Sequence, residues 1–390
     1  MKRSTSGLCA WIVGAVLCSS VAAARFDIRQ YGATPNDATD DTAAILKAIQ
    51  ACRDAGGGEV FVPAGTYRIA RQGKESPVLG LPSDTTLRGE GAASVLQFDP
   101  RVNQTNFWRM IGAAPGGCRN VIICDLHLDG SNTYRSYQPG KTPEQNHGIF
   151  LHTEKGVIEN VTIRNCLVEN FSGDCISIGV GCRNITVQNV AVRNFVRQGI
   201  QMAGGSGATG YLVTGCQDLE GTVRPGGSTI HVEHARGLTN VIIANNRCRH
   251  SILAGGVDGL VIRGNVIAGR LVGNNDKNTI IEGNVVRGDD RPGAVTQFGY
   301  ADGLIIRGNV VTSPHAEAIG IYVWGSSRYN PAPSQNVLIS DNLLRLSGRG
   351  VFLNGVRRAV IRGNLFGSAD AAERLVIQRT EEVDSDVSEP

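Results

Sequence analysis

The sequence predicts an all-β solenoid of stacked coils with one α-helix at its amino-terminal end. Two observations predict it. A short phrase of alternating β-branched residues recurs along the chain, and an amphipathic helical pattern precedes the first copy. The length of 390 residues points the same way, because a single hydrophobic core seldom supports so long a chain without repeats or a second domain.

The repeated phrase is a strand followed by a tight corner. Its copies begin near residues 160, 184, 240, 259, 278, 303, 336 and 359, and read NVTIRNC, NITVQNV, NVIIANN, GLVIRGN, NTIIEGN, GLIIRGN, NVLISDN and AVIRGNL. Glycine and asparagine at the corner suit a positive φ. Because one such unit cannot bury its apolar side alone, the repeats indicate coils stacked on one another.

One corner of the stack is expected to carry a column of asparagines. Its members are Asn246, Asn265, Asn284, Asn309, Asn342 and Asn364. Their amides can bond to one another from coil to coil, so we predict a structural ladder that takes no part in chemistry.

Residues 1–24 are predicted to be a secretory signal peptide. A basic leader, MKRSTSG, precedes the apolar run LCAWIVGAVLCSSV, and alanines supply a cleavage site near Ala23 or Ala24. That run is too short to span a membrane, and no other segment is apolar enough. We therefore expect a secreted or periplasmic protein without a membrane span.

Residues 25–75 are predicted to cap the stack. Thr39 can begin a helix over residues 40–55, on which Ile45, Ile49 and Cys52 share one face. Such a helix would cover the apolar end of the first coil. Coils are expected over residues 76–365, and residues 366–390 are expected to form a carboxy-terminal cap and an acidic, disordered tail.

The segment FDIRQYGATPNDATDDTAAILKAIQACRDAGGGEVFVPAGTYRI resembles the amino-terminal signature of the pectate-lyase superfamily. That group contains polygalacturonases, phage tail-spike depolymerases and secreted mannuronan epimerases, and the resemblance covers nearly all of the mature chain. It implies a right-handed parallel β-helix and an exported, carbohydrate-active protein whose partner is a polysaccharide.

Charge and cysteine content restrict the alternatives. The chain has 38 basic and 35 acidic side chains and lacks a basic run, so nucleic acid is not an expected partner. The oligomeric state is not predicted. Eight cysteines follow the leader, at positions 52, 118, 124, 166, 175, 182, 216 and 248. Disulfides and buried free thiols both remain open.

The second strand of each coil is expected to present polar side chains on its outer surface. The rows HGIFLH, DCISIG, QGIQMA and STIHVE begin at residues 147, 174, 198 and 228, and alternation sends every second side chain outward. Later rows, aligned in the same way, place Thr296, Phe298, Tyr322 and Trp324 outward.

The predicted catalytic residues are Asp174, His152, His231, Glu233 and His147. His147 lies one coil from Asp174, about 5 Å away, where it would hold the carboxyl group ionised and itself be held protonated, as in acid–base sites. The alternative is an exposed ion pair that contributes little.

The predicted substrate-binding residues are Lys155, Arg197, Gln198, Gln201, Tyr322 and Trp324. Cations suit a sugar carboxylate, and exposed aromatic rings suit sugar-ring stacking. No metal-ligating set is predicted and no cofactor is required. Calcium stays open, although no column of outward carboxylates is expected.

Most catalytic motifs of the family are absent from this chain. Polygalacturonases carry Asn-Thr-Asp, Gly-Asp-Asp and Gly-His-Gly, where this chain has Gln145-Asn146-His147, Ser172-Gly173-Asp174 and Arg197-Gln198-Gly199. Only Asp174 matches. The epimerase motif Tyr-Gly-Phe-Asp-Pro-His is not retained in residues 174–179.

The function predicted from these residues is cleavage of a uronic-acid-containing polysaccharide by β-elimination. That reaction needs a cation near the carboxylate, a base and an acid, which the histidines, Lys155 and Arg197 could supply. One alternative is a polygalacturonase-like hydrolase that uses Asp174, although Asp174 and Glu233 are expected to lie too far apart for hydrolysis. The other is a non-catalytic glycan-binding or surface protein.

Overall fold

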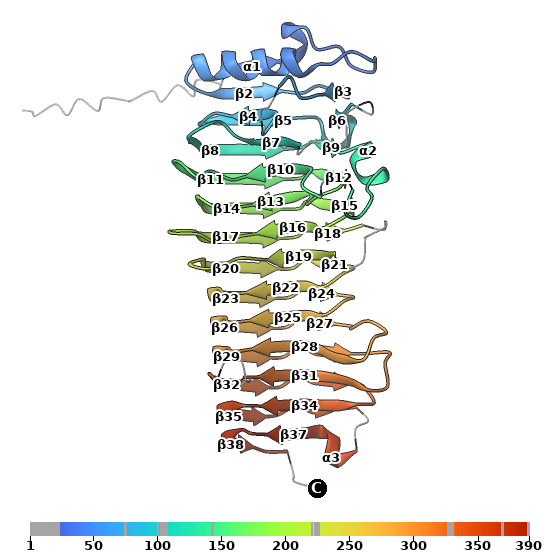
Figure 1. The fold of residues 1–390 in the computed structure, drawn as a ribbon, viewed down its shortest axis with the longest axis vertical. Helices are drawn as coiled ribbons and strands as arrows, with labels where there is room; N and C mark the ends of the chain where they lie inside the picture. Colours follow the sequence, from blue (N-terminus) through green and yellow to red (C-terminus); the bar gives the residue numbers. More distant parts are fainter. Residues whose placement is uncertain are drawn as a thin grey trace, which may run out of the picture.

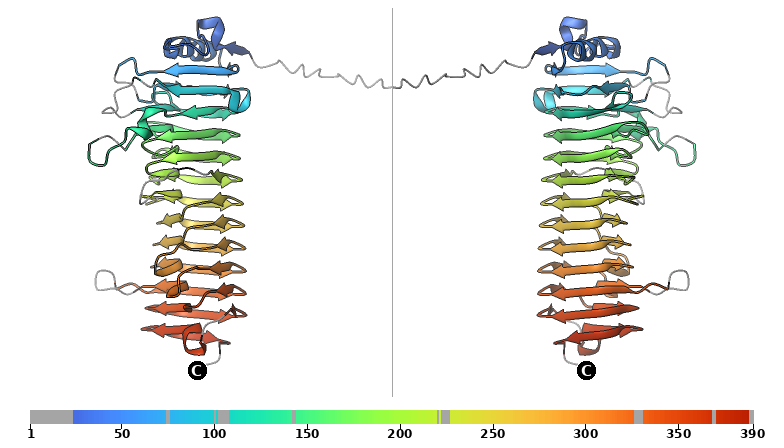
Figure 2. Two further views of the ribbon diagram at one scale, coloured as in Figure 1. Left: turned by 90° about the vertical axis from the view of Figure 1, so that its right-hand side faces the viewer. Right: turned by 90° about the vertical axis from the view of Figure 1, so that its left-hand side faces the viewer.

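The structure is a computed structural model that describes residues 24–73, 76–99, 101, 108–141, 144–219, 221, 227–325, 331–367 and 370–387. Residues 1–23 of the predicted signal peptide lie outside the described residues. The described chain winds into a tall stack of coils, shown in Figure 1 and, from two further sides, in Figure 2. Three parallel sheets, named A, B and C here, run the length of the stack.

Sheet A has fourteen strands. They are β1 (Arg25–Asp27), β2 (Gly58–Phe61), β5 (Thr85–Arg88), β8 (Gly117–Cys124), β11 (Val157–Arg164), β14 (Cys182–Gln188), β17 (Thr209–Thr214), β20 (Thr239–Ala244), β23 (Asp258–Arg263), β26 (Lys277–Glu282), β29 (Asp302–Arg307), β32 (Ser334–Ser340), β35 (Val356–Arg362) and β38 (Glu381–Ser385).

Sheet B has twelve strands, most of them short. They are β3 (Gly65–Ile69), β6 (Ser94–Phe98), β9 (His127–Asp129), β12 (Leu167–Phe171), β15 (Ala191–Phe195), β18 (Gln217–Asp218), β21 (Arg247–Cys248), β24 (Val266–Ile267), β27 (Val285–Val286), β30 (Val310–Thr312), β33 (Leu343–Arg345) and β36 (Leu365–Phe366).

Sheet C also has twelve strands and carries the candidate site. They are β4 (Leu79–Leu81), β7 (Arg109–Ala113), β10 (His147–Leu151), β13 (Ile176–Ile178), β16 (Gln198–Met202), β19 (Ser228–Val232), β22 (Ile252–Gly255), β25 (Leu271–Asn274), β28 (Gly293–Gly299), β31 (Ala318–Trp324), β34 (Arg349–Asn354) and β37 (Leu375–Gln378).

The core is a set of apolar columns inside the stack. On sheet C, for example, one column consists of side chains that are all fully buried, namely Ile149, Ile176, Ile200, Ile230, Ile252 and Leu271. Each coil supplies one inward residue per position and covers the apolar edge of the next, as expected for a solenoid. The predicted all-β fold, a right-handed parallel β-helix, is confirmed.

The helix α1 (Thr42–Asp54) lies across the amino-terminal end of the stack (Figure 1). Ile45, Ile49 and Cys52 are buried on its inner face, as their spacing predicted. The helix begins later than expected, and Thr39 does not cap it; the backbone N–H of Thr42 instead donates to Asp40 Oδ1 at 3.0 Å. Two further helices are single turns, α2 (Asn132–Arg135), which projects from one side, and α3 (Ala371–Arg374).

The stack extends beyond residues 76–365 at both ends. β1, β2 and β3 precede this range, and β37 and β38 follow it. The segment expected to be a disordered tail therefore forms a strand through Ser385, because its carboxylates pair with arginines of the preceding coil. Asp384 bonds to Arg362, and Glu382 lies 3.8 Å from Arg357.

The predicted asparagine ladder is confirmed. Each side-chain amide donates from Nδ2 to the Oδ1 atom of the next asparagine at 2.9–3.0 Å, from Asn246 through Asn364. The same Oδ1 atoms also accept the backbone N–H of the preceding asparagine. The ladder therefore satisfies buried polar groups at every corner that it occupies.

Replacing Asn284 by alanine is expected to lower the free energy of unfolding by about 1–3 kcal/mol, because it orphans buried hydrogen-bonding groups of Asn265 and Asn309. Chemical denaturation measures this loss, and activity should be unchanged. Asn274→Ala, at an exposed position, is the matched control. Equal stability of the two variants would contradict a structural role for the ladder.

The sequence alignment of sheet C is wrong in two places. The coil that contains β25 was predicted from its repeated phrase, but its sheet C strand was not among the predicted rows. At β28 the predicted register is wrong by one residue, because Thr296 pairs with Ile321 and points inward, as does Phe298. The segment GAVTQF at residues 293–298 has apolar residues on both faces of the strand. Alternation alone therefore does not determine which face points inward.

The eight described cysteines are free and buried. Burial raises the pKa of their thiols, for example to about 11 at Cys118 and about 12 at Cys166. They therefore behave as small apolar residues of the core. None of the described helices combines the length and the apolar character needed to cross a membrane.

Candidate active site

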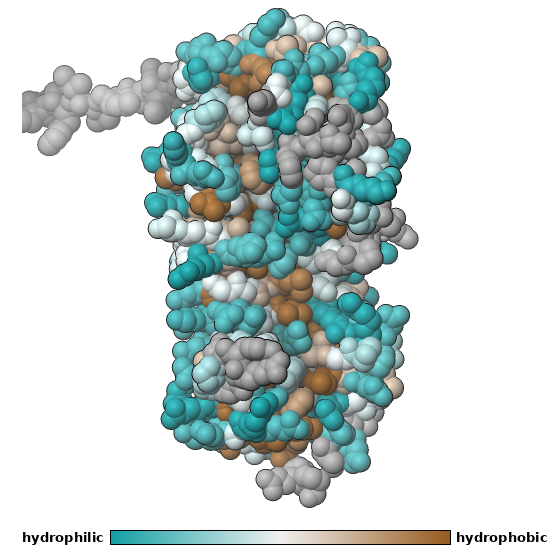
Figure 3. Space-filling view, in the orientation of Figure 1, coloured by the Kyte–Doolittle hydropathy of each residue, from teal (hydrophilic) through white to brown (hydrophobic). Residues whose placement is uncertain are grey.

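The polar residues predicted on sheet C lie on adjacent strands. In the middle column, Phe150 pairs with Ser177, Ser177 with Gln201, and Gln201 with His231, as expected. Polar residues gather over these middle coils on the face seen in Figure 3. Six residues of these strands and their flanks are joined in one network of hydrogen bonds and ion pairs, in which the backbone N–H of Gln198 links to Asp174 and its side chain links to His231. The members are Asp174, His147, Arg197, Gln198, His231 and Glu233.

Asp174 lies at the bottom of this network and not on its surface. Only 1% of the residue is exposed, because His147, Arg197 and Gln198 cover it. Its Oδ1 atom accepts the backbone N–H of Gln198 at 3.1 Å, and its Oδ2 atom lies 3.3 Å from His147 Nδ1. The prediction that Asp174 is accessible on the outer surface is therefore wrong.

The charge states predicted for Asp174 and His147 are also wrong. His147 is 1% exposed, and burial lowers its pKa well below the usual value. Its Nδ1 atom accepts the backbone N–H of Asp174 at 2.9 Å, so this ring is neutral. Burial raises the pKa of Asp174 to about 7, against the opposing effect of Arg197. The pair thus favours neutral partners over an ion pair.

The raised pKa of Asp174 should make the stability of the protein depend on pH. Asp174 binds its proton more tightly in the native state than in the unfolded chain, so its contribution to stability is lost as pH rises from about 4 to about 7. Asp174→Asn, which cannot ionise, is therefore expected to gain about 2–4 kcal/mol relative to the wild type over that range. Urea unfolding at several pH values measures the difference.

The control for this experiment is Asp290→Asn, which alters an exposed aspartate and should follow the wild-type pH dependence. Parallel stability curves for wild type and Asp174→Asn would show that the carboxyl group titrates normally in the native state.

Arg197 joins the two carboxyl groups of the network. Its Nε atom lies 3.6 Å from Asp174 Oδ1, and its Nη2 atom donates to Glu233 Oε2 at 3.0 Å. Asp174 and Glu233 are therefore close enough to share one guanidinium, which is nearer than the sequence spacing suggested. The Arg197 side chain is 23% exposed and that of Glu233 is 27% exposed, so both can meet a ligand.

The hydrogen bonds of Gln198 determine the tautomer of His231. The backbone N–H of Ser228 donates to Gln198 Oε1 at 3.2 Å, so the amide nitrogen must be the atom that faces His231. This nitrogen donates to His231 Nδ1 at 3.0 Å. Neutral His231 therefore carries its proton on Nε2. Burial lowers the pKa of His231, against the effect of Glu233, and the ring offers a donor at neutral pH.

His152 and Lys155 lie at the edge of the network. His152 is half-buried, its Nδ1 atom accepts the backbone N–H of Val180 at 3.3 Å, and burial lowers its pKa. Its ring stacks on Phe150, with centroids 5.3 Å apart. Lys155 is exposed on the corner after β10, and its side chain makes no ion pair with any described residue. The structure does not join Lys155 to the network.

Arg109 was missed by the sequence reasoning. It begins β7, pairs with His147 in register, and places its guanidinium 4.6 Å from the centroid of Phe150. Burial and the nearby charge of Arg71 lower the pKa of Arg109. The aligned rows started at His147, whereas the row RMIGAA one coil earlier shows the same alternation and would have identified this residue.

Tyr322 and Trp324 lie far from the network. Four coils separate β31 from β19, which corresponds to about 19 Å along the stack. Tyr322 stacks on Phe352 with centroids 4.9 Å apart, and Trp324 packs edge-on against Tyr300 at 4.6 Å. Both rings are half-buried. The structure therefore does not bring them together with the predicted catalytic residues.

The remaining predicted binding residues, Gln198 and Gln201, are mostly buried by their partners. Each is 7% exposed, and Gln201 Oε1 accepts from Ser177 Oγ at 2.7 Å. They orient their neighbours more than they meet a ligand. Across the described part of the chain, histidine, cysteine, aspartate and glutamate form no group of three that could hold a metal ion.

Two family models match this chain. Residues 25–116 match "Rhamnogalacturonase A/epimerase, pectate lyase-like", and residues 215–373 match "Periplasmic copper-binding protein (NosD)". Among the described residues of 215–373, histidine, cysteine, aspartate and glutamate form no group of three that could hold a metal ion, so the match to this model is not evidence of a copper site.

Curated relatives match part of the chain. Mannuronan C5-epimerase AlgE3 of Azotobacter vinelandii is 33% identical over 153 residues, which cover 38% of this chain and 8% of the relative. A probable polygalacturonase of Arabidopsis thaliana, At3g15720, is 28% identical over 209 residues, which cover 42% of this chain and 44% of the relative. The chain thus spans less than half of the length of these relatives.

Solved structures match nearly the whole chain. The A-module of mannuronan C-5 epimerase AlgE4 of Azotobacter vinelandii has a TM-score of 0.60 at 19% identity and covers 93% of this chain and 100% of its own. The exopolygalacturonase of Thermotoga maritima has a TM-score of 0.63 at 16% identity and covers 88% of this chain and 91% of its own. At these identities the likeness shows the fold. That fold is a right-handed parallel β-helix, and within it residues 25–116 resemble the pectate lyase-like family model.

Proposed function

We propose that this protein acts on a uronic-acid-containing polysaccharide and cleaves it by β-elimination. The observation that carries the proposal is the arrangement of Arg197, Glu233 and His231 on one face of sheet C. A cation, a carboxylate and an imidazole N–H donor lie on neighbouring strands, and none of the three is fully buried.

Each group has one role in the proposed reaction. Arg197 neutralises the sugar carboxylate, which makes the proton on the adjacent carbon more acidic. The carboxylate of Glu233 takes that proton, and the electron pair forms a carbon–carbon double bond as the glycosidic carbon–oxygen bond breaks. His231 Nε2–H then donates its proton to the leaving oxygen. Asp174 positions Arg197 and does not touch the substrate.

The upper part of the same face offers further binding groups. Arg109 lies four coils from Glu233, about 19 Å along the stack, with Phe150 and His152 between them. A polymer that runs along the axis would place additional sugar carboxylates near Arg109 and a sugar ring near Phe150. The uronate substrate class is further supported by the mannuronan C5-epimerases among the relatives.

Epimerisation is the second candidate, and the same relatives favour it. It begins with the same proton abstraction, but a proton returns to the opposite face of the carbon and no glycosidic bond breaks. Glu233 and Arg197 would keep their roles, whereas His231 would assist the return of the proton.

The decisive experiment incubates the purified protein with polygalacturonate, polymannuronate and a neutral glucan. Lyase activity on a polyuronate gives new ultraviolet absorbance from the unsaturated product together with new chain ends, and this is the expected result. New reducing ends without absorbance would mean hydrolysis and would overturn the proposal. Incorporation of solvent deuterium without chain cleavage would identify an epimerase.

Export remains a prediction from the leader sequence. The match of residues 215–373 to a model named for a periplasmic protein supports it. Fractionation of cells that express the full chain, with amino-terminal sequencing of the exported form, would test both the location and the cleavage site.

A further inference from the structure

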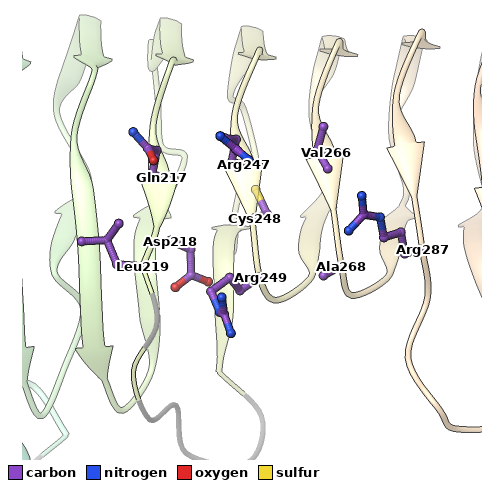
Figure 4. Close-up of a pocket in the computed structure, with 9 residues that line it drawn as sticks. All are labelled: Gln217, Asp218, Leu219, Arg247, Cys248, Arg249, Val266, Ala268 and Arg287. Carbon is purple, nitrogen blue, oxygen red and sulfur yellow. The ribbon is translucent and has the colours of Figure 1, made fainter.

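A cleft of about 510 Å³ opens on the outer side of sheet B. It extends over β18, β21, β24 and β27, on another side of the coil from the candidate active site on sheet C. Figure 4 shows its residues in two rows across successive strands. Its lining includes Asp218, Arg247, Arg249, Val266, Ala268 and Arg287.

Three arginines line this cleft. Arg247, Arg249 and Arg287 are exposed, and their side chains form no hydrogen bond or ion pair with any residue that the structure describes. Nearby, Arg270 and Arg291 both pair with Asp289. Cations spread over two coils, about 10 Å, favour a ligand that carries more than one negative charge.

The arginines favour an anionic ligand, whereas Asp218, which also lines the cleft, requires a hydrogen-bond donor. Its side chain is 1% exposed, and its Oδ2 atom accepts from Thr229 Oγ1 at 2.5 Å and lies 2.7 Å from His250 Nδ1. Its Oδ1 atom is buried and has no hydrogen-bond partner among the residues that the structure describes. An unpartnered carboxylate oxygen in the wall of a cleft calls for a donor from a ligand. His250 belongs to this cluster.

We propose that the cleft on sheet B binds an acidic oligosaccharide as a second glycan site. Carboxylates on the sugar chain would pair with the arginines, and a sugar hydroxyl would donate to Asp218 Oδ1. Val266 and Ala268, both exposed between Arg249 and Arg287, offer an apolar surface for a sugar ring. Duplex DNA supplies anions but no backbone hydroxyl, so it does not meet the requirement of Asp218.

This inference rests on the substrate class proposed above but not on the proposed reaction. A polyuronate held on sheet B would keep the protein attached to its polymer while sheet C acts on another segment. Binding at two sites of one chain raises the effective concentration of polymer at the second site.

The test is calorimetric titration of hexagalacturonate and hexamannuronate into the Glu233→Gln variant, in which turnover is expected to be strongly slowed. Maltohexaose serves as the neutral probe and a duplex DNA oligonucleotide as the other polyanion. The double substitution Arg249→Gln/Arg287→Gln is expected to remove one hexauronate site per chain and to leave the melting temperature unchanged. Arg263→Gln alters an exposed arginine of sheet A whose side chain pairs with no described residue, and it should leave all binding intact.

The same number of sites and the same affinity in the double variant would overturn the inference. Binding of DNA, but not of hexauronates, at these arginines would also overturn it. If the proposed reaction on sheet C fails, hexauronate binding that depends on Arg249 and Arg287 would persist, so the two proposals fail separately.

Discussion

Replacing Glu233 by glutamine is expected to lower kcat on a polyuronate by about a hundredfold to ten-thousandfold. That range is typical for the loss of a general base. Glutamine keeps an oxygen that can accept from Arg197 Nη2, which now lies 3.0 Å from Glu233 Oε2, but it cannot take up a proton. Steady-state kinetics should therefore show a loss in kcat with a similar KM and an unchanged melting temperature.

The matched control is Glu317→Gln, which removes an exposed carboxylate far from the network and should keep full activity. A Glu233→Gln enzyme that retains activity within a few-fold of wild type would exclude Glu233 as the base. A rise in KM at constant kcat would instead assign Glu233 to substrate binding.

Replacing Ile176 by aspartate is expected to prevent folding or to lower stability by several kcal/mol. Ile176 is fully buried between Ile149 and Ile200 of the neighbouring coils, so the introduced charge has neither water nor a partner. This cost is comparable to the whole stability of a typical domain. Circular dichroism during thermal unfolding measures the effect.

Ile242→Asp is the control for this experiment, because Ile242 lies on β20 with 36% of its surface exposed. Its melting temperature should stay close to that of the wild type. If Ile176→Asp melts at the same temperature as Ile242→Asp, residue 176 does not face the core and the register of β13 is wrong.

The proposed site contains mostly the residues that the sequence predicted, but their burial and their contacts differ from the prediction. Sequence alternation identified His147, Asp174, His231 and Glu233, because it determines which residues face outward on each strand. It could not show that Asp174 is covered, since that depends on side chains from three adjacent coils. It could not show the pKa of Asp174 for the same reason, because burial by these neighbours raises that pKa to about 7.

The sequence by itself determined the coil architecture and the asparagine ladder. Both follow from local, repeated chemistry: β-branched alternation favours strands, asparagine and glycine favour the corners, and stacking identical units aligns their amides. The terminal strand β38 was not predicted, because its acidic composition suggests disorder until the arginines of the preceding coil are placed beside it.

Only the tertiary structure decided how the polar groups interact. Arg197 contacts both Asp174 and Glu233, although these residues are far apart in sequence, and Gln198 determines the tautomer of His231. The register of β28 and the cluster of Asp218 with His250 were likewise decided by neighbouring coils. Charge, protonation and exposure depend on distances between side chains from different coils, and a pattern along one strand does not contain those distances.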